Sequence, residues 1–356
     1  MKQARLQRVI ANMERMGLPQ LLISDPDSIY YLTGIGYDPG ERLLALYLDT
    51  EGRAHLFNNH MFPQEPQEGL EIHFYDDTDD YMALVAGVVR DGVLGVDKFL
   101  RAKFLLPLLE KRSGLMPQLG SQAVDLARTY KDAEEIALMR RASALNDETM
   151  EEVICRLGEG LTERQMVSVV GEAHLRRGAD VAYEHLICFG KGSCESHHCS
   201  GPAKIQPGEP AIFDIFAPVD RYWCDMTRTV FFRSVSDEQR RVYDVVRNAN
   251  EAGIAAIRCG VPLSEVDAAA RKVISDAGYG EYFTHRTGHG IGLALHEPPD
   301  CSSTSQATVE PGMCFSVEPG IYLPGKWGVR IEDLVVVTED GVEVLNHFTK
   351  DLLVVD

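Results

Sequence analysis

Histidine and glycine are concentrated in one short segment of the chain. Residues 284–297 read THRTGHGIGLALHE and hold His285, His289 and His296, with a glycine on each side of His289. Imidazole nitrogens bind metals and carry protons, and glycine lets the backbone pass close to another group. The segment is therefore a candidate site for binding a metal ion, a substrate or both.

A predicted β-hairpin carries two aspartates that could share a cation. Residues 211–232, AIFDIFAPVDRYWCDMTRTVFF, contain two apolar runs around a polar turn. With the turn centred between Val219 and Asp220, Asp214 lies opposite Asp225. Opposed residues of an antiparallel pair point to one face, with Cβ atoms about 5 Å apart. Two aspartates there would repel each other unless a cation lay between them.

A second predicted hairpin repeats the arrangement with two glutamates. In residues 315–337, FSVEPGIYLPGKWGVRIEDLVVV, a turn at residues 324–326 places Glu318 opposite Glu332. Arg330 precedes Glu332 by two residues, so it shares that face. A slip of one residue would turn one partner away, so one such pair would be weak evidence. Two pairs in apolar strands indicate a shared function.

Four buried carboxylates require compensation, and metal ions are the simplest source of it. Burying them unpaired would be prohibitively unfavourable, whereas two divalent cations would neutralise them. Oxygen-rich sites favour Mn²⁺, Mg²⁺, Fe²⁺ or Co²⁺, and a histidine ligand shifts the preference toward transition metals. We therefore predict that one histidine of residues 284–297 completes a metal site and that the others lie beside the substrate.

Other chemistries fit the motifs less well. The glycines of residues 288–292 have the wrong spacing for a dinucleotide-binding loop, and the segment runs into Pro298–Pro299 where that motif needs a helix. None of the eight cysteines lies in a recognisable nucleophile context. Cys194 and Cys199 bracket two histidines, but their spacing matches no standard zinc pair. We expect reduced cysteines.

The elements around these motifs alternate between strands and helices. The first ~125 residues contain short apolar runs and turns of an α/β pattern; their histidines, His55, His60 and His73, look isolated and structural. From residue 132 onward, helical periodicity predicts helices over 132–157, from Gly160 onward, over 236–258 and over 262–277, and the last two alternate with strands. We predict an α/β (α+β) chain with domains at 1–125 and 126–356.

Composition places the chain among globular proteins and excludes some partners. The apolar fraction is 45% and the charged fraction 25%. The formal charge of −19 argues against binding nucleic acid or an anionic membrane. No run of ~18 apolar residues predicts a membrane span, and the first residues lack the apolar core of a signal peptide. We expect a cytoplasmic protein.

At these motifs the sequence resembles the pita-bread metallopeptidases: prolidase, aminopeptidase P and their relatives. YYLTG at residues 30–34 resembles a motif of the family's creatinase-like N-terminal domain. TYKDAEEIALMRRA, from residue 129, resembles the helix that opens the catalytic domain. FDIF…CDMTRT, TGHGIG, VEPGIY and VRIED follow in the family's order. The resemblance implies a creatinase-like domain followed by a pita-bread catalytic domain, often in a homodimer.

The resemblance also implies roles for individual residues. Asp214 would bind one metal ion, and Asp225 and Glu332 would bridge two. His289 and Glu318 would complete the second site. The implied ions are Mn, Co, Zn or Fe.

Further roles concern the substrate. The resemblance implies that His197, His285 and His296 hold substrate carbonyls and stabilise developing charge; we prefer His197 to its neighbour His198. Glu318 would carry a proton to the leaving nitrogen, and Thr227 would support a bridging carboxylate. Arg330 would either place a positive charge near the substrate or hold the ligand carboxylates.

The implied reaction is metal-dependent hydrolysis of Xaa-Pro bonds in short peptides. Two positions depart from the family pattern. Ser196 replaces a proline before the first outer histidine, and Asp300 stands where many dipeptidases carry an arginine for the substrate's C-terminal carboxylate. Asp300 would repel that carboxylate, so aminopeptidase P-like activity stays open beside dipeptidase activity. A non-peptidase on the same fold, such as a metal-dependent lyase acting on a small zwitterion, is the alternative.

Overall fold

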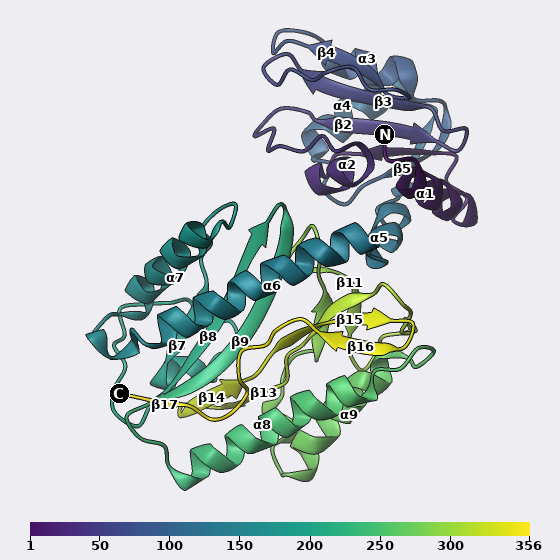
Figure 1. Ribbon diagram of the computed structural model, residues 1–356. Helices are drawn as coiled ribbons and strands as arrows, with labels where there is room; N and C mark the ends of the chain where they lie inside the picture. The colour runs from purple at the N-terminus through teal and green to yellow at the C-terminus, as the bar shows by residue number, and fades with distance from the viewer. The chain divides into compact units, whose positions relative to one another are not determined.

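The computed structural model describes residues 1–356 except the side chain of Glu159, and it consists of two compact units, Met1–Arg128 and Thr129–Asp356. Both units are mixtures of helices and strands (Figure 1), which confirms the predicted α/β class. The boundary predicted after residue 125 falls inside helix α5 (Gln122–Thr129), in which the first unit ends. Among the described residues, no helix is long and apolar enough to cross a membrane.

The N-terminal unit is built on a six-stranded sheet in the order β4-β3-β2-β1-β5-β6. Its strands are β1 (Gln20–Ile23), β2 (Ala45–Asp49), β3 (Ala54–Asn59), β4 (Glu71–Tyr75), β5 (Gly92–Val96) and β6 (Leu115–Leu119). Its other helices are α1 (Gln3–Arg15), α2 (Pro26–Thr33), α3 (Tyr81–Val88) and α4 (Ala102–Lys111). Strands β3 and β4 are parallel, with Phe57 beside His73. The prediction that His55 and His73 are isolated is wrong, because this pairing brings their rings within 5.2 Å.

The C-terminal unit contains three sheets. Their strand orders are β17-β9-β8-β7, β11-β10-β12-β15-β16 and β13-β14. The strands are β7 (Leu186–Phe189), β8 (Pro210–Val219), β9 (Tyr222–Phe232), β10 (Gly288–Gly290), β11 (Glu297–Cys301), β12 (Cys314–Val317), β13 (Gly320–Leu323), β14 (Trp327–Arg330), β15 (Asp333–Thr338), β16 (Gly341–Val344) and β17 (Val354–Val355). The helices are α6 (Ala133–Ile154), α7 (Glu163–Arg177), α8 (Asp237–Ala256) and α9 (Leu263–Asp276). These bounds confirm the helices predicted from periodicity.

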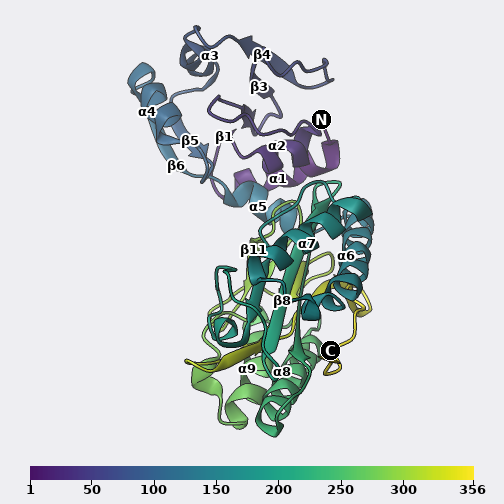
Figure 2. The ribbon, with the colours of Figure 1, turned by 90° about the vertical axis from the view of Figure 1, so that its left-hand side faces the viewer.

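Helices flank the sheets of this unit. Helix α6 lies along β8 and β9, and α7 lies beside β7 (Figures 1 and 2). Met150 and Val170 from the two helices share a buried cluster with Phe213 and Met226 of β8 and β9. Helix α8 packs against α9 and against the β13–β14 hairpin. Helices thus pack on one face of the long β8–β9 hairpin, which leaves its other face for the site.

The first hairpin has a different register from the predicted one. Its turn is Asp220–Arg221, with φ angles of 47° and 70°, a left-handed pair typical of two-residue hairpin loops. Asp214 therefore pairs with Thr227, and Asp225 pairs with Phe216. The turn centre lies one residue later than predicted, which moves each partner by two positions. A shift of two keeps the face, so both aspartates still point to one side.

The second hairpin has the predicted register, but its two glutamates are not ladder partners. The β13–β14 ladder ends at the pair Gly320–Arg330, and Glu318 and Glu332 lie between that ladder and the β12–β15 ladder. The backbone N–H of Glu318 donates to the carbonyl of Thr287 at 2.7 Å, and that of Glu332 donates to the carbonyl of Thr227 at 3.0 Å. At this break between the two ladders, the two hydrogen bonds connect the second hairpin to β9 and to the glycine-rich segment.

Candidate metal centre

A cavity of about 890 Å³ opens in the C-terminal unit, where the three sheets meet. Carboxylate, imidazole and guanidinium groups line it. Nine of the ten residues predicted for the site, all except Thr227, are among them: Asp214, Asp225, His289, Glu318, Glu332, His197, His285, His296 and Arg330. The structure therefore brings together, in one cavity, motifs that are spread over 136 positions of the sequence, from 197 to 332 inclusive.

Glycines allow the strand that carries His289 to reach the centre of this cavity. A Cβ atom on Gly288 would lie 1.8 Å from the carbonyl oxygen of Ser316, and one on Gly290 would lie 2.4 Å from that of Pro298. Strand β10 thus packs closely between β11 and β12, and a side chain at either position would clash with backbone. Glycine indicates a close approach of the backbone to another group, and in the structure that group is the backbone of the neighbouring strands.

The ring of His289 is oriented as a ligand. Its Nδ1–H donates to the carbonyl of Gly290 at 3.0 Å, which leaves the lone pair of Nε2 free for a cation. Nε2 lies 3.6 Å from Oε1 of Glu318 and 3.8 Å from Oδ2 of Asp225. Ligand atoms of His289, Asp225 and Glu332 lie within 4.8 Å of one another. Three donor groups therefore surround one point.

The carboxylates have acceptor capacity that the described protein groups leave unused. Oδ1 of Asp225 and Oε1 of Glu332 are buried and without a hydrogen-bond partner among the described residues. Burial, reinforced by the charge of Glu332, holds the pKa of Asp225 well above its usual value. Burial also raises the pKa of Glu318 to about 7 and lowers the pKa of His289 to about 3. Such a set of groups fits divalent cations, which satisfy buried anions and bind neutral imidazole.

Arg330 and Thr227 connect carboxylates from both hairpins. Arg330 is buried, and its Nη2 donates to Oδ2 of Asp214 at 2.7 Å. Its Nε donates to Oγ1 of Thr227 at 3.1 Å, and that hydroxyl donates to Oε2 of Glu332 at 2.7 Å. Of the two roles expected for Arg330, the geometry favours holding the ligand carboxylates.

The outer histidines occupy different environments. His197 is exposed at the cavity wall, whereas His198 hydrogen-bonds to the buried carboxylate of Glu163 at 3.0 Å. The ring of His296 meets that of His289 edge to face, with centroids 4.1 Å apart. His197 and His296 thus both line the cavity, whereas the ring of His198 is held by Glu163.

Both ring nitrogens of His285 are engaged by protein groups. Nδ1–H donates to the carbonyl of Arg286 at 2.7 Å, and Nε2 lies 2.8 Å from the hydroxyl of Tyr322. The same hydroxyl accepts from Nη1 of Arg330 at 2.9 Å, so its hydrogen points to His285. The geometry thus favours a role for His285 in positioning Tyr322 and Arg330.

Several site residues were not anticipated from the sequence. Tyr322 follows Glu318 by four residues, so alternation along the predicted strand would place both on one face, a signal that was available. Ser316 accepts from the backbone N–H of His289 at 3.0 Å and lies 3.3 Å from Glu318. Arg286 lines the cavity and forms an ion pair with Asp300. That pair corrects the expectation for Asp300: its charge is matched by an arginine 14 residues away, a contact that sequence spacing does not reveal.

This donor set suits divalent metal ions. Residues 137–339 match the model of metallopeptidase family M24, and residues 5–114 match the creatinase/prolidase N-terminal domain. The chain therefore belongs to metallopeptidase family M24 and is a metallopeptidase.

Known relatives extend over nearly the whole chain. An uncharacterized peptidase of Staphylococcus aureus (strain MSSA476) is 34% identical over 97% of this chain and 99% of its own length. A dipeptidase of Pyrococcus horikoshii OT3 superposes with a TM-score of 0.92 at 32% identity, covering 98% and 99% of the two chains. A prolidase of Thermococcus sibiricus gives 0.91 at 30% identity, covering 99% of both.

Proposed function

We propose that this metallopeptidase hydrolyses Xaa-Pro bonds in short peptides with two divalent ions, Mn, Co, Zn or Fe, held by Asp214, Asp225, His289, Glu318 and Glu332. The observation that carries the metal assignment is the pair of buried carboxylate oxygens, one on Asp225 and one on Glu332, that have no hydrogen-bond partner among the described residues. When bound, divalent ions supply Lewis acidity and bring the pKa of water toward neutrality. The Xaa-Pro preference is supported by the likeness to a prolidase.

Glu318 is well placed to move a proton. Its side chain is 16% exposed, compared with 6% for Asp225, so it faces the cavity more openly. The prolyl nitrogen of an Xaa-Pro bond must gain a proton before it leaves. A carboxylate at the cavity edge can take that proton from attacking water and deliver it to the nitrogen.

Arg286 provides a binding point for the C-terminal carboxylate of a dipeptide. It lines the cavity, and its ion pair with Asp300 orients the guanidinium. An arginine fork can bind two carboxylates, because it carries five N–H donors. We therefore propose that Asp300 supports substrate binding through Arg286, and that dipeptides are the preferred substrates.

Matched peptides test this function. Metal-stripped protein receives Mn²⁺, Co²⁺ or Zn²⁺, and hydrolysis of Ala-Pro, Ala-Pro-Ala and Ala-Ala-Ala is compared, with Asp225→Asn as the inactive control. We expect Ala-Pro to be cleaved fastest and Ala-Ala-Ala not to be cleaved. Faster cleavage of Ala-Pro-Ala would indicate an aminopeptidase P-type enzyme instead. If no metal restores cleavage of either proline peptide, the proposal fails and the lyase alternative becomes the one to test.

Replacing Arg286 tests the carboxylate contact separately. Arg286→Gln should raise KM for Ala-Pro by roughly 10-fold or more, the loss of one charged hydrogen bond, and should change KM for Ala-Pro-amide little. An equal effect on both substrates would show that Arg286 does not bind the carboxylate.

A further inference from the structure

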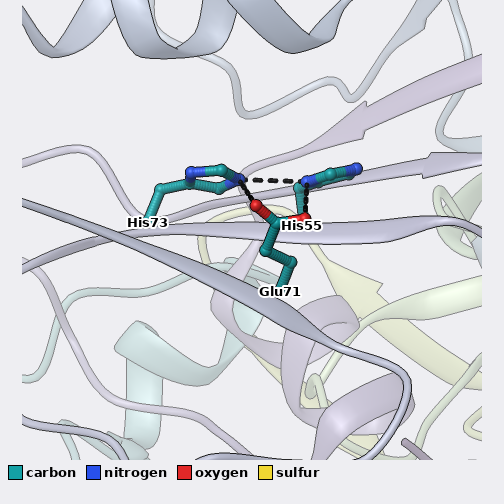
Figure 3. A group of neighbouring side chains, drawn as sticks. All are labelled: His55, Glu71 and His73. Atoms are coloured by element: carbon teal, nitrogen blue, oxygen red, sulfur yellow. Dashed lines mark hydrogen bonds and ion pairs between the residues drawn. The ribbon is translucent and has the colours of Figure 1, made fainter.

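A second group of metal-binding side chains lies in the N-terminal unit, on neighbouring strands of the six-stranded sheet. Figure 3 shows the rings of His55 and His73 and the carboxylate of Glu71 pointing toward one another. His55 lies on β3, opposite Glu71 on the parallel strand β4, and Glu71 and His73 share a face because they are two residues apart. The sheet register alone therefore places the three groups together.

The distances among the donor atoms suit a single small cation. Nδ1 of His55 lies 3.0 Å from Nε2 of His73 and 3.4 Å from Oε2 of Glu71, and Nε2 of His73 lies 3.5 Å from Oε1 of Glu71. Bonds of ~2.05 Å at tetrahedral angles around Zn²⁺ would separate donor atoms by about 3.3 Å. The three observed distances bracket that value, with the two histidines facing different oxygens of the Glu71 carboxylate.

Hydrogen bonds among the three side chains do not satisfy these contacts as well as a metal cation would. Two neutral imidazoles can share only one hydrogen between Nδ1 of His55 and Nε2 of His73, so the accepting nitrogen directs its lone pair toward the carboxylate as well. Charging both rings would satisfy Glu71 but would set two cations 3.0 Å apart.

Surrounding rings hold the ligands in place before an ion binds. The ring of His73 stacks on Phe57, with centroids 5.1 Å apart, and the ring of His55 meets Tyr47 edge to face at 5.8 Å. The two histidine side chains are 19% and 23% exposed, whereas Glu71 is 63% exposed. An ion can therefore enter from solvent, and its fourth position faces water.

We propose that His55, Glu71 and His73 form a second metal site that binds one borderline divalent ion, for which Zn²⁺ is the probe. Two imidazoles and a carboxylate are a donor set that zinc uses in proteins. The ion would link β3 to β4, the edge strand of the sheet, and so would stabilise that edge. The proposal does not depend on the proposed peptidase activity, because all three ligands belong to the unit Met1–Arg128.

Zinc content of the full-length chain tests the proposal. After equilibrium dialysis against Zn²⁺ and elemental analysis, Glu71→Gln and His73→Gln should each contain one zinc ion per chain less than the parent. His60→Gln is the matched control, because His60 also pairs with one carboxylate, Asp76 at 3.1 Å, and stacks on a phenylalanine ring. Its zinc content should equal that of the parent.

The same variants in an Asp225→Asn background separate this site from the cavity of the other unit. There, Zn²⁺ should raise the midpoint of thermal unfolding, and His73→Gln should abolish that rise. Glu71→Gln alters an exposed side chain and gives the same test if His73→Gln does not fold. Unchanged zinc content in both ligand variants would overturn the proposal.

Discussion

The guanidinium of Arg330 donates a 2.7 Å hydrogen bond to the carboxylate of Asp214. Through Thr227, the same guanidinium also supports Glu332 on the other hairpin. One buried cation thus orders acidic groups that would otherwise repel one another. It compensates only part of their charge, which leaves the remainder for metal ions.

Replacing Arg330 should weaken metal binding more than it weakens the fold. Arg330→Lys keeps a positive charge but cannot make the three contacts with Asp214, Thr227 and Tyr322 at once. We expect metal affinity or kcat to fall by roughly 10–100-fold, as measured by titration of metal-stripped protein and by steady-state kinetics. Full metal affinity in Arg330→Lys would show that these contacts do not position the ligands.

Thr227 and Thr229 offer a matched pair on one face of β9. Thr227→Val removes the hydroxyl that donates to Glu332 at 2.7 Å, and we expect a loss of about 10–100-fold in metal affinity. Thr229→Val removes a hydroxyl that donates to the backbone carbonyl of Arg330 at 2.9 Å, and it should affect metal affinity much less. Calorimetric titration with Mn²⁺ distinguishes the two. Equal losses would mean that the hydroxyl of Thr227 has no special role.

A buried chain of neutral histidines predicts a dependence of stability on pH. Nε2–H of His174 donates to Asn146 at 2.9 Å, and Nδ1 of His174 lies 3.3 Å from Nε2 of His185. Burial lowers the pKa of His174 to about 4, against 6.5 for an ordinary histidine. Between these two pH values the unfolded chain therefore binds more protons than the folded chain. Lowering the pH through this range stabilises the unfolded state relative to the folded state. Folding stability should be independent of this group above pH 6.5 and should fall as pH drops from 6.5 toward 4.

Urea unfolding of the parent and of His174→Gln between pH 4.5 and 8 checks this dependence. The free energy of unfolding of the parent should decrease with acid more steeply than that of the variant, by up to about 1.4 kcal/mol per pH unit. Parallel curves would contradict the neutral state assigned to His174.

Gly288 should be intolerant of any side chain. In Gly288→Ala the new Cβ would overlap the carbonyl oxygen of Ser316, so β10 would have to move and His289 would move with it. We expect a loss of at least about 1–3 kcal/mol in stability, measured by thermal unfolding, together with weaker metal binding. Gly87→Ala is the control and should be tolerated, since a Cβ there would meet no described atom within 4 Å beyond its chain neighbours and its own helix backbone. A stable, fully active Gly288→Ala protein would refute the close packing.

Local signals in the sequence were sufficient for most elements. Thr162 and Gln165 form the capping box that their spacing predicts, and apolar periodicity located the helices of the C-terminal domain. Long-range relations were harder. The register of the first hairpin depends on left-handed backbone conformations at Asp220 and Arg221. Aspartate and arginine do not require that conformation, so the residue types did not indicate the turn.

Contacts between distant residues were the other limit. The proximity of His55 and His73 follows from a parallel register that no short motif encodes. The pair of Arg286 with Asp300 likewise depends on the antiparallel pairing of β10 with β11, in which Asp300 lies opposite His289. The four carboxylates could be anticipated because alternation along each predicted hairpin fixes the face on which a residue lies, whereas His289 was singled out from the other histidines only by the family resemblance.

The central claim is that two divalent ions bound by Asp214, Asp225, His289, Glu318 and Glu332 are required for peptide hydrolysis. The most direct measurement is the rate of Ala-Pro hydrolysis as metal-stripped protein is titrated with Mn²⁺, in a Glu71→Gln background that confines tight binding to the cavity. We predict that activity rises from zero and saturates at two ions per chain, and that Asp225→Asn stays inactive. Activity that is independent of Mn²⁺, or an active Asp225→Asn protein, would contradict the account.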